Sequence, residues 1–233
     1  MSGHLAMPTT DLLREPFGPR EFSRAFGVSR ETTERLEIYA DRLRLWQKTI
    51  NLVAPATLKV LWMRHFADSA QLAALVPGTA RTLVDVGSGA GFPGLVLAIL
   101  FAEHGPCQRV VLIESDTRKA AFLADVVRRT GIGAAIAVDI VTERVEAAAT
   151  RDRVELADVV SARALAPMDR LLDWVAPLFG PQTVGLFLKG RDVAAELVSA
   201  EQSMELAYDL VPSRTDSRGR IVVLRRLAAK PEG

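Results

Sequence analysis

Cysteine is almost absent from this chain, since Cys107 is the only one among 233 residues. A single cysteine excludes an internal disulfide and a cysteine-built metal cage, and we expect Cys107 to lie in a loop or at a strand edge. The histidines His4, His65 and His104 are too far apart in sequence to suggest a metal site. With no secretory leader, the sequence predicts a cytoplasmic protein without a bound metal ion.

Long apolar runs and a strong net charge are also lacking. The longest run, residues 92–102, is too short to span a bilayer and is interrupted by Pro93 and Gly94, so we expect no membrane role. Lys and Arg number 29 against 28 Asp and Glu, which excludes a strongly basic coat for nucleic acid but leaves local basic patches open. The composition, 49% hydrophobic and 24% charged, is ordinary for a globular protein with one good core.

The sequence pattern divides the chain into three parts. Residues 1–20 are rich in proline, glycine and polar residues, and we expect a disordered tail. Residues 21–79 carry two helical patterns, the first capped by Ser29 and the second running from about Leu58 to Val76. From residue 80 onward, short apolar strands alternate with amphipathic helices, so residues 80–233 are predicted to form the main domain and residues 21–79 a helical extension.

Seven strands are expected in the main domain. Five parallel ones are predicted at Leu83–Val86, Val110–Glu114, Ala134–Val138, Asp158–Ser161 and Val184–Leu188. Two more, at Leu206–Val211 and Ile221–Leu227, predict a terminal antiparallel hairpin. Asp116 is expected to cap one intervening helix and Gly131 to end it, while Pro167 and Gly180 begin and end another. The fold class is therefore α/β, a mostly parallel seven-stranded sheet with helices on both faces.

The first predicted strand runs directly into a glycine-rich turn, residues 85–94, Asp-Val-Gly-Ser-Gly-Ala-Gly-Phe-Pro-Gly. Glycine can adopt positive φ and let a nucleoside lie against bare amides at a helix start. The spacing Gly89-x-Gly91-x-x-Gly94 also satisfies the dinucleotide-binding pattern. Asp85 favours a cationic sulfonium over a pyrophosphate, which it would repel. The frame resembles the first motif of class I methyltransferases that use S-adenosylmethionine.

Two later segments are suited to the rest of a nucleoside. Glu114 ends the second predicted strand, where a carboxylate would accept both ribose hydroxyls, although a solvated helix cap is the alternative. Either a nicotinamide dinucleotide or S-adenosylmethionine would supply that ribose. Val145 and Glu146 follow the third predicted strand, where an adenine needs an apolar contact and a hydrogen-bond partner.

Several motifs, in this order along the chain, carry a more specific resemblance. They are Asn51-Leu52, Arg64-His65-Phe66-Ala67-Asp68-Ser69, the glycine turn, Ser161-Ala162-Arg163-Ala164 and Leu188-Lys189-Gly190. Over about residues 30–227 the chain resembles the bacterial 16S ribosomal RNA guanine-N7 methyltransferases, the family once called glucose-inhibited division protein B.

The resemblance implies a Rossmann-like class I methyltransferase domain over residues 80–233. Its activity would be methyl transfer from S-adenosyl-L-methionine to N7 of guanine 527, in the usual rRNA numbering, with S-adenosylhomocysteine as product. The implied partner is 16S rRNA or a small-subunit precursor, bound by a monomer. The residues expected to bind cofactor are Asp85, Gly87, Gly89, Gly91, Phe92, Glu114, Val145, Glu146 and Arg163. Those expected to contact RNA are Arg64, Lys189, Arg218 and Arg220, with Arg163 and Lys189 in catalytic roles.

The residue inventory agrees with this chemistry. Guanine N7 has a free lone pair and no proton, so methyl transfer needs placement and electrostatic control but no general base. Arg163 and Lys189 are cations that can hold phosphate or guanine O6, although salt bridges at strand ends are the alternative. We expect His65 and Asp68 to form a buried polar pair, and Trp46 and Trp62 to belong to the core.

RNA contact must come from local clusters of basic residues, because the net charge is near zero. One candidate cluster belongs to the extension: Arg42, Arg44, Lys48, Lys59 and Arg64. The other belongs to the hairpin: Arg214, Arg218, Arg220, Arg225 and Arg226. Three other functions stay open: an NAD-dependent oxidoreductase, a non-catalytic RNA-binding module, and a methyltransferase acting on a small molecule or a protein.

Overall fold

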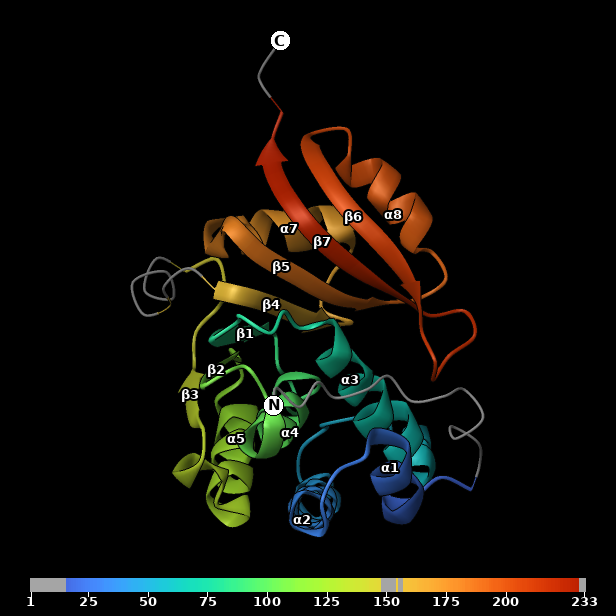
Figure 1. Ribbon diagram of the computed structural model, residues 1–233, viewed down its shortest axis with the longest axis vertical. Coiled ribbons are helices and arrows are strands. Elements are labelled where there is room, and N and C mark those ends of the chain that lie inside the picture. Colours follow the sequence, from blue (N-terminus) through green and yellow to red (C-terminus); the bar gives the residue numbers. More distant parts are fainter. Residues whose placement is uncertain (1–15, 148–153, 155–156, 231–233) are drawn as a thin grey trace.

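One seven-stranded sheet forms the centre of the described part of the chain, with the strand order β3-β2-β1-β4-β5-β7-β6 (Figure 1). The computed structural model describes residues 16–147, 154 and 157–230. The strands are β1 (Thr82–Val86), β2 (Arg109–Ile113), β3 (Ala137–Val141), β4 (Ala157–Arg163), β5 (Phe179–Lys189), β6 (Met204–Pro212) and β7 (Arg220–Ala229). The first five run parallel, while β7 pairs antiparallel with both β5 and β6. The predicted fold class and the terminal hairpin are confirmed.

Successive side chains in the central strands enter two different cores. Leu83 and Leu112 belong to the core on one face, whereas Val84 and Val111 belong to the core on the other. Both faces of the sheet are covered, which explains why these strands are almost continuously apolar.

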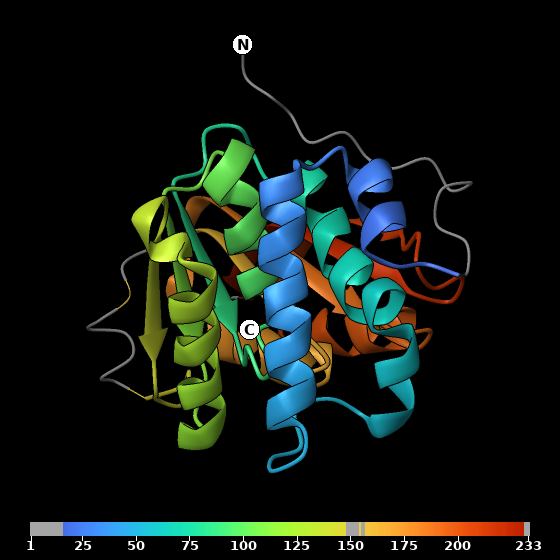
Figure 2. The same ribbon diagram turned by 90° about the horizontal axis from the view of Figure 1, so that it is seen from below.

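Helices cover the sheet on both sides (Figures 1 and 2). The first face carries α1 (Pro19–Phe26), α2 (Arg30–Trp46), α4 (Gly94–His104) and α5 (Thr117–Thr130), and the second carries α7 (Met168–Val175) and α8 (Val193–Ala200). Figure 2 shows α2 between α5 on one side and α1 on the other. In the described residues, no helix has the length and apolar character needed to cross a membrane.

The predicted helix from Leu58 to Val76 is a succession of irregular turns. A 3₁₀ segment (Pro55–Val60) is followed by a π segment (Trp62–Ala67), a short α3 (Asp68–Ala70) and a second 3₁₀ segment (Gln71–Leu75). The sequence periodicity indicates a helical run, but spacings of three and four residues do not distinguish these pitches. Single π turns inside helices are frequent at functional sites.

Several predicted boundaries are confirmed by capping contacts. The Ser29 hydroxyl accepts a hydrogen bond from the Thr32 amide at 3.1 Å. The Asp116 carboxylate accepts from the amides of Arg118 and Lys119 at 2.8 and 3.2 Å. Gly131 ends α5 with φ 65°, a left-handed conformation that glycine adopts without steric cost.

Three predicted boundaries are wrong. β3 begins at Ala137 and not at Ala134, because Ile132–Ala134 form a 3₁₀ turn after the helix cap. Gly180 does not end a helix, since α7 stops at Val175 and Gly180 lies within β5. The expected tail also ends too late, because α1 begins at Pro19, where proline suits a first helical turn. The rest of that prediction, residues 1–15, lies outside the described residues.

The helical extension and the sheet share one hydrophobic core. Tyr39 in α2 is fully buried and its hydroxyl donates to the Ala90 carbonyl in the glycine turn. Trp62 is buried and packs against Phe66 with ring centroids 4.7 Å apart, as expected for a core residue. Trp46 is half-buried, and its indole N–H donates to Asp125 Oδ2 at 3.0 Å. Residues 21–79 therefore pack directly against the turn that was predicted to hold a ligand.

Candidate functional site

Two cavities lie next to each other and share part of their wall. The glycine-loop cavity, about 450 Å³, is lined by residues 87–90, Phe92, Glu114 and residues 143–146, among others. The basic cavity, about 510 Å³, is lined among others by Ser213, Asp216 and Gly219 of the β6–β7 loop (residues 213–219). The residues common to both linings are His65, Arg163, Ala164 and Leu165. Ligands in the two cavities would therefore meet at this shared wall.

The structure places seven of the nine predicted cofactor residues on the lining of the glycine-loop cavity. They are Gly87, Gly89, Phe92, Glu114, Val145, Glu146 and Arg163. Val145 is buried and offers an apolar surface, while Glu146 is exposed at the rim. The other two, Asp85 and Gly91, lie behind this lining.

Asp85 lies beneath the turn and not in the cavity. Its Oδ1 accepts a hydrogen bond from Ser161 Oγ at 2.7 Å, and a Cβ on Gly94 would come within 2.7 Å of its Oδ2. Alternation along β1 puts Asp85 on the same face as Leu83, which α4 covers. Burial raises the pKa of Asp85 to about 6, with the hydrogen bond from Ser161 opposing that rise. The sequence predicted that Asp85 contacts the cationic cofactor, but in the structure Asp85 supports the turn from below.

The glycines of the turn take left-handed conformations with different surroundings. Gly87, Gly89 and Gly91 have φ of 66°, 57° and 87°. A Cβ on Gly89 would have no neighbour closer than 3.8 Å, whereas one on Gly87 would lie 2.4 Å from Leu165 Cδ1. A Cβ on Gly91 would lie 2.6 Å from the Tyr39 hydroxyl. Gly89 faces open space, while Gly91 permits close packing of the turn on α2.

Glu114 fixes the turn and also lines the cavity. Its Oε2 accepts from the Gly89 amide at 2.7 Å and its Oε1 accepts from the Asp116 amide at 2.8 Å. A carboxylate oxygen can accept a second hydrogen bond, so Glu114 can still receive hydroxyl donors from a ligand. Its position directly after β2 agrees with the sequence prediction.

Arg163 is held from three sides at the shared wall. Its Nη2 donates to His65 Nδ1 at 2.8 Å, and its Nη1 lies 3.4 Å from Asp68 Oδ2. Its guanidinium carbon lies 4.9 Å from the centroid of the Phe92 ring, a cation–π geometry. The predicted His65–Asp68 pair is therefore joined through Arg163.

His65 is neutral in this setting. An arginine can only donate, so His65 Nδ1 accepts from Arg163 and Nε2 carries the proton that is shared with Thr57 Oγ1 at 2.8 Å. Burial, followed by the charges of Arg163 and Arg64, lowers the pKa of His65 to about 3. The next residue along the wall, Ala164, has φ 51°, a strained value for a residue with a Cβ.

Lys189 lines the basic cavity but is already neutralised. Its Nζ lies 2.5 Å from Glu196 Oε2 and donates to the Ala166 carbonyl at 2.8 Å. Only 7% of its side chain is exposed. The sequence predicted a cation available to RNA, but the carboxylate in α8 that pairs with it could not be identified by spacing.

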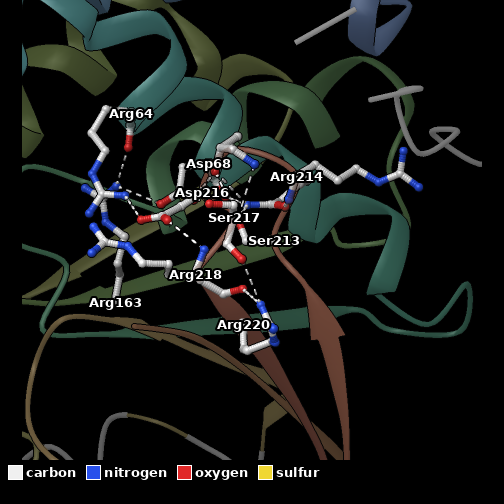
Figure 3. A network of polar contacts seen from close by, with 12 residues as sticks. Arg64, Asp68, Arg163, Ser213, Arg214, Asp216, Ser217, Arg218 and Arg220 are labelled. Atoms are coloured by element: carbon white, nitrogen blue, oxygen red, sulfur yellow. Dashed lines mark hydrogen bonds and ion pairs between the residues drawn. The ribbon is translucent and has the colours of Figure 1, made fainter. Parts of the chain in front are cut away.

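The predicted hairpin cluster of arginines is divided in the structure. Arg220 lines the basic cavity, and Arg218 is exposed outside its lining. In Figure 3 the Arg214 side chain runs away from those of Arg64 and Arg163. Arg225 and Arg226 lie farther along β7 and pair with Asp209 and Glu205 across the strands.

The basic residues of the extension are also separated. Arg64 is half exposed, lines the basic cavity and pairs with Asp216 at 3.3 Å. Arg42 instead pairs with Asp125 on α5 at 2.6 Å, and Arg44 with Asp41 at 3.0 Å. Arg64 of the extension thus lines the same basic cavity as Arg220 of β7.

Sequence reasoning did not connect Arg163 with several residues that the structure brings next to it. His65 and Asp68 stand in the motif that carried the resemblance, but their contact with Arg163 spans 98 and 95 residues. Ala164 and Leu165 follow Arg163 and gave no separate signal. No group of three or more His, Cys, Asp or Glu residues among those described could hold a metal ion.

Comparison with known proteins gives a family match over most of the chain. The profile of the family described as GidB, rRNA small subunit methyltransferase G, matches residues 32–218. A protein of Parvibaculum lavamentivorans named ribosomal RNA small subunit methyltransferase G is 50% identical over 212 residues, covering 91% of this chain and 90% of its own. A protein of the same name from Rhodospirillum centenum is 48% identical and covers 96% of this chain and 98% of its own.

Solved structures resemble the fold. A crystal structure described as that of a candidate S-adenosyl-L-methionine-dependent methyltransferase from Methanococcus maripaludis superposes with a TM-score of 0.52. It is 13% identical in sequence and covers 83% of this chain and 94% of its own. At that identity the match concerns the arrangement of strands and helices alone.

Proposed function

Because the chain belongs to the rRNA small subunit methyltransferase G family, we propose that it transfers the methyl group of S-adenosyl-L-methionine to N7 of a guanine in 16S rRNA. The proposed target is guanine 527 in the usual rRNA numbering, presented by 16S rRNA or a small-subunit precursor to a monomeric enzyme. The observation that carries this proposal is the pair of cavities that share a wall at His65 and Arg163.

The residues that line the glycine-loop cavity support this choice of cofactor. Glu114 would accept hydrogen bonds from the ribose hydroxyls, and Val145 would contact the adenine, with Glu146 beside it. The open space at Gly89 lets a ligand approach the backbone closely. When bound, the cofactor supplies a methyl group on a sulfonium, which is already activated for displacement.

The shared wall suits an acceptor that has no proton to lose. His65 is neutral, with one nitrogen occupied by Arg163 and the other by Thr57, so it is not poised as a general base. Arg163 stays a cation and can hold the O6 side of a guanine or a phosphate. Guanine N7 offers a lone pair without a proton, so orientation is the main requirement.

A mapping experiment tests the proposal. Small-subunit RNA and small ribosomal subunits are incubated with the protein and S-adenosylmethionine, and N7-methylguanosine is located by borohydride–aniline cleavage. We expect one new cleavage at the target guanine and none without cofactor. Binding of NADH in place of S-adenosylhomocysteine, measured by calorimetry, would instead support an oxidoreductase. Cofactor binding with methylation confined to protein or small molecules would contradict the RNA substrate.

A further inference from the structure

A buried polar network joins the β6–β7 loop to the irregular helical segment below it. Gln71 is 1% exposed, and its Nε2 lies 3.0 Å from Asp68 Oδ1, 3.2 Å from Ser213 Oγ and 3.3 Å from Thr215 Oγ1. Its Oε1 accepts from the Arg214 amide at 3.0 Å. The Thr215 hydroxyl donates to the same Asp68 Oδ1 at 2.6 Å. Two side chains of the segment thus bind three consecutive loop residues.

The chemistry of its neighbours fixes the orientation of the Gln71 amide. The Arg214 amide can only donate, so it must face Oε1. The Asp68 carboxylate, when ionised, can only accept, so it must face Nε2. A glutamate at position 71 would set one carboxylate against another, and an apolar residue would leave both loop and segment groups unsatisfied.

The same network reaches the shared wall. Asp68 contacts Gln71 and Thr215 through Oδ1. Its Oδ2 contacts Arg163, which is drawn with it in Figure 3. The loop in turn supplies Ser213 and Asp216 to the lining of the basic cavity. Gln71 itself lines neither of the two cavities.

We propose that Gln71 is a positioning residue that clamps the β6–β7 loop against Asp68, and so holds the RNA nucleotide in the basic cavity opposite Arg163. This inference rests on the proposed function. The contacts of Gln71 itself reach neither the glycine turn nor Glu114, and the clamp is linked to Arg163 only through Asp68, so we expect it to act mainly on the RNA side.

The test compares variants that break the clamp with matched ones that keep it. Gln71→Glu introduces repulsion, and Thr215→Val removes one hydroxyl at constant shape. Thr215→Ser restores the donor, and Ser217→Ala removes an exposed loop hydroxyl that lies outside the network. Three quantities are measured: amide hydrogen exchange of the peptide over residues 213–219 by mass spectrometry, S-adenosylhomocysteine affinity by calorimetry, and kcat and KM for small-subunit RNA.

We expect exchange in Gln71→Glu and Thr215→Val to be about fivefold faster, since a net hydrogen bond contributes on the order of 1 kcal/mol. The value of kcat/KM for RNA should fall by about the same factor, while S-adenosylhomocysteine affinity stays within about twofold. Thr215→Ser and Ser217→Ala should behave as the wild type.

Unchanged exchange in Thr215→Val, which buries no new charge and should fold, would overturn the clamp. Faster exchange with unchanged kcat/KM for RNA would show that the loop does not position the substrate. A parallel loss of S-adenosylhomocysteine affinity in folded Thr215→Val would overturn the assignment of the clamp to the RNA side. Absence of methylation by the wild type refutes the proposed function instead, and in that case the clamp is judged by exchange and by RNA affinity, which need no reaction.

Discussion

Gly87, Gly89 and Gly91 share a positive φ, but a side chain at each would meet different surroundings. Only at Gly89 would it enter open space beside the cavity lining. At Gly91 it would meet Tyr39, which is fully buried and stacks on Phe92 with ring centroids 5.3 Å apart. One motif thus combines a position facing the cavity with a position that packs the core.

Replacing Gly89 or Gly91 with alanine should therefore lower the free energy of unfolding by different amounts. Gly89→Ala should lower the free energy of unfolding by about 1 kcal/mol, the cost of a left-handed conformation. Gly91→Ala adds a steric clash and should cost roughly 3 kcal/mol. Urea unfolding measures both. The Gly89→Val protein should fold but should no longer bind S-adenosylhomocysteine, as measured by calorimetry. Equal unfolding costs for the two alanine variants would contradict the packing of Gly91 on Tyr39.

Asp85 gives the protein a defined pH dependence. Its pKa rises from 3.8 to about 6 because it is buried, so the folded chain holds this proton more tightly than the unfolded chain. Ionisation therefore costs the folded state free energy as the pH rises from about 4 to about 6, in total roughly 3 kcal/mol. Well below pH 3.8 both states are protonated and the cost is absent.

Asp85→Asn removes this titration. The difference in free energy of unfolding between variant and wild type should move in the variant's favour by roughly 3 kcal/mol between pH 4 and pH 7. Urea unfolding at several pH values measures it, and any constant loss from the altered hydrogen bond with Ser161 cancels in the comparison. A difference independent of pH would mean that Asp85 titrates normally.

Among the elements, β7 and the loop before it carry two pairs of arginines with different surroundings. Arg218 lies in the loop and Arg220 begins β7 at the basic cavity, while Arg225 and Arg226 pair with carboxylates on β6. Arg218→Ala with Arg220→Ala should reduce the slope of log affinity for RNA against log salt by roughly 1.5 units. The matched double variant of Arg225 and Arg226 should leave the slope unchanged. Equal slopes in both variants would show that RNA does not bind at this end of the strand.

Elements were predictable where local chemistry decides them. The caps at Ser29 and Asp116 and the stop at Gly131 follow from side-chain oxygens and from a left-handed φ, which depend on neighbours in sequence. The start of β3 depended on how the chain turns after Gly131, and the pitch of the segment at residues 55–75 depends on tertiary packing.

For the molecule as a whole, the predicted extension and main domain share one core. Phe22, Leu36 and Phe66 of the extension lie in the same apolar cluster as Leu83 of β1. We therefore expect a single unfolding transition. Trp174→Phe leaves Trp46 and Trp62, both in the extension, as the fluorescent residues. Its fluorescence and far-UV circular dichroism should give the same urea midpoint, and an earlier fluorescence midpoint would mean that the extension unfolds separately.

The candidate site was predictable where its residues follow strand ends and not where they meet across the chain. Gly89 and Glu114 follow β1 and β2, whose carboxyl ends meet at one edge of the sheet. The partners of Arg163 and Lys189 come from an irregular helical segment and from α8, and spacing carries no information on either. The neutralisation of Lys189 and the burial of Asp85 could be found only in three dimensions.

The wall shared by the two cavities also has a stereochemical and kinetic consequence. Ligands that meet only at His65, Arg163, Ala164 and Leu165 must be present together for a group to pass between them. In the proposed reaction the methyl group then goes directly from donor to acceptor, without residing on the protein. Steady-state rates would follow a sequential and not a ping-pong law, and a methyl group made chiral with hydrogen isotopes would arrive on the RNA with inverted configuration.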